Sequence, residues 1–194
     1  MKKRRVFVAI GISSQLKEEI AYWQKKWNHL SVRWIKPENM HVTLVPPWYT
    51  TKVDKVLDSL KFVNQDRGRF WTSQNDAIKA FTITFREVVF GPNPKRPRLI
   101  WASGDVPSEI LILKSKLGKI LQPRQTWLAQ KREKRPFLTH LTIARFKEED
   151  FTKFTIKTLH DEVFWKEKIH SFLLMESHLR RSGAEYETLY SLNF

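Results

Sequence analysis

The sequence of 194 residues contains no cysteine, only six glycines and no long apolar run. Because cysteine is absent, the chain forms no disulfide bond, holds no metal through thiolates and has no cysteine nucleophile. Its longest apolar runs, such as residues 6–10 and 110–113, are far shorter than the roughly 20 residues that cross a bilayer. We therefore expect a cytoplasmic protein without a membrane partner.

Motifs for cofactors are missing as well. With so few glycines, the sequence has no Gly-rich loop that would cradle the phosphates of ATP. None of the six histidines stands in a His-x-x-x-His pattern or a similar spacing of metal ligands. The sequence therefore predicts no cofactor and no metal site.

Positive charge dominates the composition. Lysine and arginine number 35 against 20 acidic residues, which gives a formal net charge of +15. Hydrophobic residues make up 41% of the chain, so it can build a core and is not a disordered tail. A cationic field attracts polyanions, and this favours a nucleic acid or a phosphate ligand. The basic clusters are either solvated faces or contacts to an RNA backbone; they lie at residues 2–5, 95–98 and 131–135.

Strands and helices follow one another without a regular strand-helix-strand rhythm. This order predicts an α+β fold with a largely antiparallel sheet, in one domain that spans residues 1–194. The proline pair Pro46-Pro47 is expected to end the third strand. Helices are expected from Ser13 or Ser14 to about Leu30 and at residues 53–63 and 107–121; strands are expected at residues 5–10, 32–35, 40–45, 78–90, 98–102, 137–144, 169–179 and 185–194.

Two short segments share a His-x-Thr motif within an apolar, strand-like context. The first holds His41 and Thr43, and the second holds His140 and Thr142. Side chains two residues apart share one face of a strand. Each segment therefore presents an imidazole and a hydroxyl together, while its alternate residues face a core. A lone histidine on a strand is more often structural, but the repeated pattern favours a functional pair.

A pair of imidazoles can carry out acid–base chemistry on a phosphodiester. One neutral imidazole takes a proton while a protonated one gives a proton, on opposite sides of phosphorus. The hydroxyls of Thr43 and Thr142 can donate hydrogen bonds to the non-bridging oxygens. Arg145 follows His140 by five residues and offers a bidentate phosphate contact; by itself it also fits a solvated surface charge.

A family resemblance is carried by much of the chain. It is most specific at residues 34–44 and 135–145, and it extends to residues 5–10, 32–33, 96–101, 175–177 and 183–186. On these segments the chain resembles the bacterial and archaeal RNA 2′,3′-cyclic phosphodiesterases, also called 2′-5′ RNA ligase-like, of the two-histidine (2H) phosphoesterase superfamily.

The resemblance implies a bilobal 2H phosphoesterase fold, with two largely antiparallel sheets and flanking helices around a central groove. It implies hydrolysis of RNA-terminal or nucleotide 2′,3′-cyclic phosphates to 2′-phosphomonoesters without a metal or another cofactor. His41 would then protonate the departing 3′ oxygen, and His140 would activate water. Thr43, Thr142 and Arg145 would hold the phosphate. The partners would be RNA ends or cyclic nucleotides, and we expect a monomer.

The sequence departs from the family after the first motif. Many relatives continue there with an aromatic-Leu-Gly type of segment, whereas this chain continues with Val45, two prolines, Trp48 and Tyr49. Either aromatic residue could stack on a terminal base or simply pack in a loop.

Three other functions stay open at this point. The same histidines would serve in joining or cleaving 2′-5′ linkages in tRNA halves or oligoadenylates. A scaffold of this kind could also bind nucleotides or RNA without turnover, although both motifs are intact. The remaining possibility is a basic interaction protein in which the motifs are incidental, and it would be supported if His41 and His140 lay far apart or were both buried.

Overall fold

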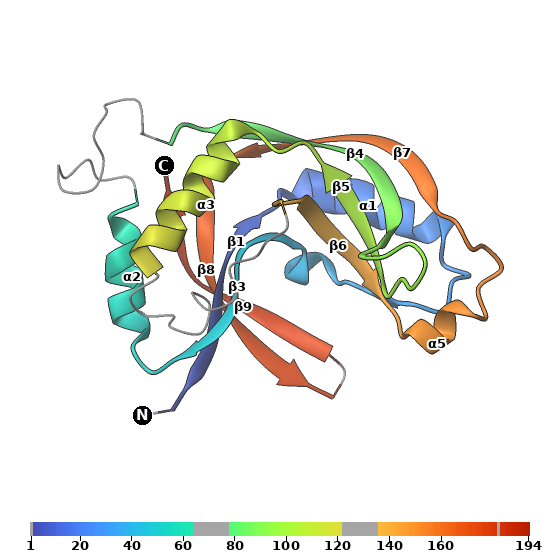
Figure 1. Cartoon of the computed structure of the whole chain (residues 1–194), viewed down its shortest axis with the longest axis horizontal. Helices are drawn as coiled ribbons and strands as arrows, with labels where there is room; N and C mark the ends of the chain where they lie inside the picture. Colours follow the sequence, from blue (N-terminus) through green and yellow to red (C-terminus); the bar gives the residue numbers. More distant parts are fainter. Residues whose placement is uncertain (1, 64–77, 122–135, 182) are drawn as a thin grey trace.

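A computed structural model describes residues 2–63, 78–121, 136–181 and 183–194 of the chain. It confirms the α+β class, because strands of one large antiparallel sheet alternate with a few helices (Figure 1). The helices are α1 (Ser14–Lys26), α2 (Val53–Lys61), α3 (Ser108–Leu121), the single turn α5 (Glu148–Phe151) and the 3₁₀ turn η1 (Pro37–Asn39). The strands are β1 (Arg4–Gly11), β2 (Arg33–Trp34), β3 (His41–Thr50), β4 (Phe81–Gly91), β5 (Leu99–Gly104), β6 (Thr139–Arg145), β7 (His160–Ile169), β8 (Ser171–Arg180) and β9 (Gly183–Asn193).

The sheet has two halves that meet in the middle. Its strand order is β7-β4-β5-β6-β3-β1-β8-β9, and β2 pairs with β6 outside this path. The strands β3 and β6 are joined by one residue pair, Val42 and Leu141, whereas pairing within each half is extensive. The two sheets that the resemblance implies are therefore two halves of one continuous sheet, and this residue pair joins them.

The helices cover the sheet on its apolar side. The helix α1 packs against β7 in one half, and α2 and α3 pack against each other beside β3 and β9 in the other (Figure 1). The apolar residues Leu16, Ile20 and Trp23 of α1 are buried, and the Ser13 hydroxyl accepts a hydrogen bond from the backbone N–H of Leu16, as expected of an N-cap. Across the described part of the chain, no helix combines the length and the apolarity needed to span a bilayer.

The proline pair does not end the third strand. The strand β3 continues through Pro46 and Pro47 to Thr50, and this part of the prediction is wrong. The register of β3 against β1 shifts at this place, where Val6 pairs with Trp48 and Val8 pairs with Val45. A bulge tolerates proline because the inserted residues leave the hydrogen-bonded ladder, so the missing N–H costs no ladder bond.

One strand and one short helix were not predicted. The strand β7 has alternating burial toward its C-terminal end, but the sequence hides the pattern because Glu167 occupies a buried position and Phe164 an exposed one. It pairs with β4 along eight residue positions and so forms the edge of its half of the sheet.

Candidate active site

The two His-x-Thr motifs meet at the centre of the sheet. The central residues of the motifs, Val42 and Leu141, are the single pair that joins β3 to β6, and they are 1% and 0% exposed. Side chains alternate along a strand, so the histidines and threonines on either side of this pair all point to the opposite face of the sheet. In the antiparallel register, each histidine then lies alongside the threonine of the other motif.

The predicted polar residues line one small pocket of about 70 Å³ on that face. The pocket holds all five residues that the sequence assigned to phosphate chemistry. Three further residues complete its wall. The lining residues are His41, Thr43, His140, Thr142 and Arg145, together with Ile35, Asn39 and Tyr186.

A bulge in β6 turns Arg145 toward the pocket. In a regular strand, residues five apart lie on opposite faces, so Arg145 would point away from His140. The register against β5 shifts between Ile100, which pairs with Ala144, and Trp101, which pairs with Thr142. The extra residue of the bulge is Ile143, which is buried. Bulges of this kind re-aim a side chain, and here the bulge brings the guanidinium to the imidazole face.

Both imidazoles are oriented by the backbone. The Nδ1 atom of His41 lies 2.8 Å from the carbonyl oxygen of Asn39, and the Nδ1 atom of His140 lies 3.0 Å from the carbonyl oxygen of Leu138. Because a carbonyl oxygen only accepts, Nδ1–H is the donor in both rings. Each ring therefore keeps its Nε2 atom free of this bond, to accept or donate a proton.

Aromatic side chains support each imidazole. The ring of His41 packs between Phe7 and Tyr186, with centroid distances of 5.0 and 4.9 Å. The ring of His140 packs on Trp101 at 4.8 Å. Such packing fixes the orientation of a ring, and a group held in one rotamer loses no further entropy when it reacts.

Burial makes His41 a weak base. Desolvation between its aromatic neighbours lowers the pKa of His41 to about 4, although the hydrogen bond with the Asn39 carbonyl opposes this shift. The charges of Arg145 and His140 lower the pKa further. In the unliganded site, His41 is therefore neutral at pH 7, and its Nε2 atom carries a lone pair.

Gly91, the last residue of β4, lies against the indole of Trp101, and a Cβ atom there would overlap the ring. We expect Gly91→Ala to displace Trp101 from His140 and to lower kcat/KM for a cyclic phosphate about tenfold. Overpacking of this kind costs about 1–3 kcal/mol, so the Tm should fall by several degrees. Kinetics and thermal unfolding would measure both effects.

Gly118→Ala is a matched control for this variant. Gly118 lies within α3, and none of the described atoms lies within 4 Å of the added Cβ. We expect unchanged kinetics and an unchanged or higher Tm, because alanine favours a helix over glycine. Wild-type kinetics and Tm in Gly91→Ala would refute the prediction that the added Cβ displaces Trp101 and thereby disturbs His140.

The structure separates the two candidate stacking residues from the pocket. Trp48 is 2% exposed and belongs to the core, so it does not stack on a base; that prediction is wrong. It shares a strand face with Val42 and Leu44, which also point into the core. Tyr49 is 60% exposed but lines a different pocket at the far end of β3.

The sequence did not single out three residues that shape the site. Asn39 and Tyr186 both line the pocket, and the Asn39 side-chain oxygen accepts a hydrogen bond from the Tyr186 backbone N–H at 3.0 Å. Trp101 supports His140 from β5. All three lie within the segments that carry the family resemblance, and this was the one signal that could have identified them.

A larger pocket of about 400 Å³ adjoins the histidine pocket. It shares Ile35, Asn39, Arg145 and Tyr186 with the smaller pocket and continues past the indole of Trp34. Its volume lies within the range of small-molecule sites. Its rim is formed by residues of β2, η1 and the start of β9, among them Arg33, Lys36, Glu38, Gly183, Ala184 and Glu185.

The comparisons with known proteins identify the family of the chain. The family model described as the 2′-5′ RNA ligase superfamily matches residues 13–180. The chain belongs to the 2′-5′ RNA ligase superfamily.

Curated relatives of this superfamily member carry one name. The RNA 2′,3′-cyclic phosphodiesterase of Archaeoglobus fulgidus is 25% identical over 192 residues, with 95% of this chain and 97% of the relative covered. The protein of the same name from Methanocaldococcus jannaschii is 27% identical over 189 residues, with 95% and 98% covered.

Solved structures show the same fold. The structure of the protein TT0787 from Thermus thermophilus matches with a TM-score of 0.78 at 18% identity, covering 97% of each chain. The structure of E. coli LigT complexed with 3′-AMP matches with a TM-score of 0.69 at 21% identity, covering 99% of this chain and 98% of the other.

Proposed function

We propose that this protein hydrolyses 2′,3′-cyclic phosphates, at RNA ends or on nucleotides, to 2′-phosphomonoesters without a metal. The observation that carries the proposal is the shared pocket, where two backbone-oriented imidazoles lie with two threonine hydroxyls and one guanidinium. The curated relatives are named for this activity. The net charge of +15 suits an anionic substrate.

The proposed reaction needs two proton transfers. A neutral imidazole takes a proton from water as its oxygen bonds to phosphorus. The bond between phosphorus and the 3′ oxygen then breaks, and the protonated imidazole gives its proton to that oxygen. Thr43, Thr142 and Arg145 hold the non-bridging oxygens, which carry negative charge throughout. The products are a free 3′ hydroxyl and a 2′ phosphate, and the two histidines exchange protonation states.

The adjoining pocket would take the terminal nucleoside. Because it opens beside Arg145 and Tyr186, a phosphate held at the imidazoles places its ribose at the entrance of this pocket. The side chain of Trp34 offers a flat apolar surface for the base, of the kind on which bases stack.

An assay in EDTA tests the proposal. Purified protein with adenosine 2′,3′-cyclic phosphate should form adenosine 2′-phosphate at the same rate with and without EDTA, because the imidazoles supply both acid and base. Chromatography separates the 2′ and 3′ products. Loss of turnover in EDTA and its return with a divalent cation would refute metal independence. Absence of turnover under all conditions would refute the hydrolase proposal itself.

Ligation is a second candidate, supported by the description of the matching family model. It runs the ring opening with a 5′ hydroxyl in place of water and forms a 2′-5′ linkage with the same two histidines. Phosphorus NMR on a mixture of RNA halves distinguishes the diester of ligation from the monoester of hydrolysis. We expect the monoester to dominate, because water is in large excess over any 5′ hydroxyl.

A further inference from the structure

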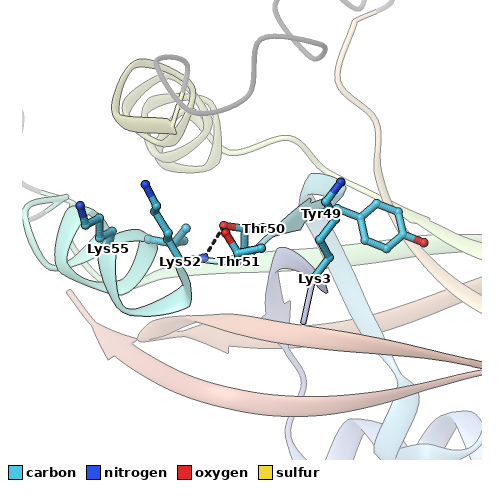
Figure 2. A pocket seen from close by; sticks show the side chains of 7 residues that line it. Lys3, Tyr49, Thr50, Thr51, Lys52 and Lys55 are labelled. Atoms are coloured by element: carbon cyan, nitrogen blue, oxygen red, sulfur yellow. Dashed lines mark hydrogen bonds between the residues drawn. The ribbon is translucent and has the colours of Figure 1, made fainter. Parts of the chain in front are cut away.

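A separate pocket, of about 470 Å³, lies at the far end of β3, where this strand leads into α2 (Figure 2). Three lysines and the exposed ring of Tyr49 surround it. Hydroxyls of two threonines lie between the lysines in Figure 2. The lining residues are Lys3, Tyr49, Thr50, Thr51, Lys52, Lys55 and Val56, and we call this surface the lysine patch.

The lysine patch is cationic and partly aromatic. Its lining residues include three lysines and no acidic residue. The side chain of Tyr49 is 60% exposed, so its ring is accessible to a ligand. Ammonium groups that pair with phosphates, next to a ring on which a base can stack, are the elements of a single-strand binding surface.

Tyr49 of the lysine patch lies on the same face of the sheet as the histidines, whereas Lys52 and Lys55 come from the start of α2. Phe7 packs on the ring of His41 and so lies on the histidine face of β1. Arg5, two residues earlier, lies on that face too, and it pairs with Tyr49 across the strands. Tyr49 is eight residues along β3 from His41, and this places the patch about 20–25 Å from the histidine pocket.

We propose that the lysine patch binds the single-stranded RNA upstream of the reacting cyclic phosphate. Its ammonium groups contact backbone phosphates, and Tyr49 stacks on a base several nucleotides before the end. Arg5 lies beside Tyr49 on the neighbouring strand, with its guanidinium donating to the Ser177 hydroxyl at 2.6 Å. The proposal rests on the proposed function, since it needs RNA whose 3′ end lies at the histidines. It predicts that affinity increases with RNA length.

Kinetics with substrates of different length test this proposal. The variant Lys3→Ala/Lys52→Ala removes two charges from the patch. For an octanucleotide that ends in a 2′,3′-cyclic phosphate, we expect its KM to rise about tenfold with kcat unchanged. For adenosine 2′,3′-cyclic phosphate, which does not reach the patch, we expect wild-type kinetics. An octanucleotide KM within twofold of the wild type would overturn the proposal, and so would an equal loss on both substrates.

The salt dependence of RNA binding and variants of the Tyr49 ring provide two independent measurements. Loss of two phosphate contacts should reduce the slope of log Kd against log salt by about 1.4 for a single strand. Tyr49→Ala should weaken octanucleotide binding, whereas Tyr49→Phe, which keeps the ring, should not. The control Lys17→Ala/Lys25→Ala removes the same charge from α1, which covers the other half of the sheet, and should behave as wild type.

Binding without turnover separates this proposal from the proposed function. Fluorescence anisotropy with a labelled octanucleotide that ends in a 3′ hydroxyl measures the affinity of the protein for RNA, even if the protein is inactive. Weaker binding by Lys3→Ala/Lys52→Ala supports the patch whether or not cyclic phosphates are hydrolysed. Equal binding by this variant and the wild type, together with normal hydrolysis of the mononucleotide, refutes the patch alone.

Discussion

Alanine at His140 should lower kcat/KM for adenosine 2′,3′-cyclic phosphate by about 10²–10⁴-fold, and alanine at His41 should do the same. Each variant loses one of the two proton transfers, while Thr43, Thr142 and Arg145 still hold the phosphate. The losses should not multiply in the double variant, because residues that act on one transition state are not additive. Steady-state kinetics of the two single variants and the double variant measure these effects.

His160→Ala is the matched control. His160 lies on the exposed face of β7, where its Nε2 atom is 3.0 Å from Glu87, and it lines neither of the two adjoining pockets at the centre of the sheet. We expect its kinetics to equal those of the wild type. Circular dichroism and Tm show whether each variant folds. Wild-type turnover in a folded His41→Ala or His140→Ala protein would exclude that residue from catalysis.

The arrangement of the histidines could be predicted from the sequence because it depends on a local rule. Residues i and i+2 share a strand face, so His41 and Thr43 must point the same way once residues 41–45 form a strand. The intervening Val42 then faces the core, as observed. That two such strands become neighbours is not a local property, and only the family resemblance indicated it.

The error at the proline pair has a physical cause that the sequence does not show. The path of β3 through Pro46 and Pro47 depends on a bulge, as does the direction of Arg145 in β6, and bulges leave no mark in the periodicity of a single strand. The sequence left open whether Trp48 stacks on a base or packs; it keeps the strand face of Val42 and Leu44 and so lies in the core. The positions of these bulges depend on how strands far apart in sequence pair with each other, and the sequence of one strand alone does not determine that pairing.

The pKa of His41 predicts the shape of the pH profile. A base must be unprotonated, so if His41 is the base, kcat/KM stays high down to about pH 4–5 and falls as the pH drops through its pKa of about 4. With His41 as the acid and His140 as the base, the reactive form again carries one proton in total, so kcat/KM falls through the same pKa, and the profile reports the pKa of His41 rather than its role. Only about one His41 in a thousand is protonated at pH 7, and we therefore expect His41 to be the base.

The family resemblance assigns the roles the other way, with His41 as the acid, so a test must separate the two histidines chemically. Sulfur in place of the 3′ oxygen of the cyclic phosphate gives a thiolate leaving group, whose conjugate acid has a pKa near 8.5 and which departs without a proton. Removing the histidine that acts as the acid then lowers kcat/KM only slightly. Removing the histidine that acts as the base still lowers kcat/KM by about 10²–10⁴-fold.

With His41 as the base, His140→Ala should recover to within about tenfold of the wild type on the sulfur substrate, while His41→Ala should remain reduced by about 10²–10⁴-fold. The wild-type protein on both substrates is the reference, and Thr142→Ala, which removes a phosphate contact but no proton, should lose the same factor on each. Recovery of His41→Ala instead would contradict our assignment. It would mean that the bound phosphate raises the pKa of His41 by about 3 units, or roughly 4 kcal/mol, and so makes it the acid.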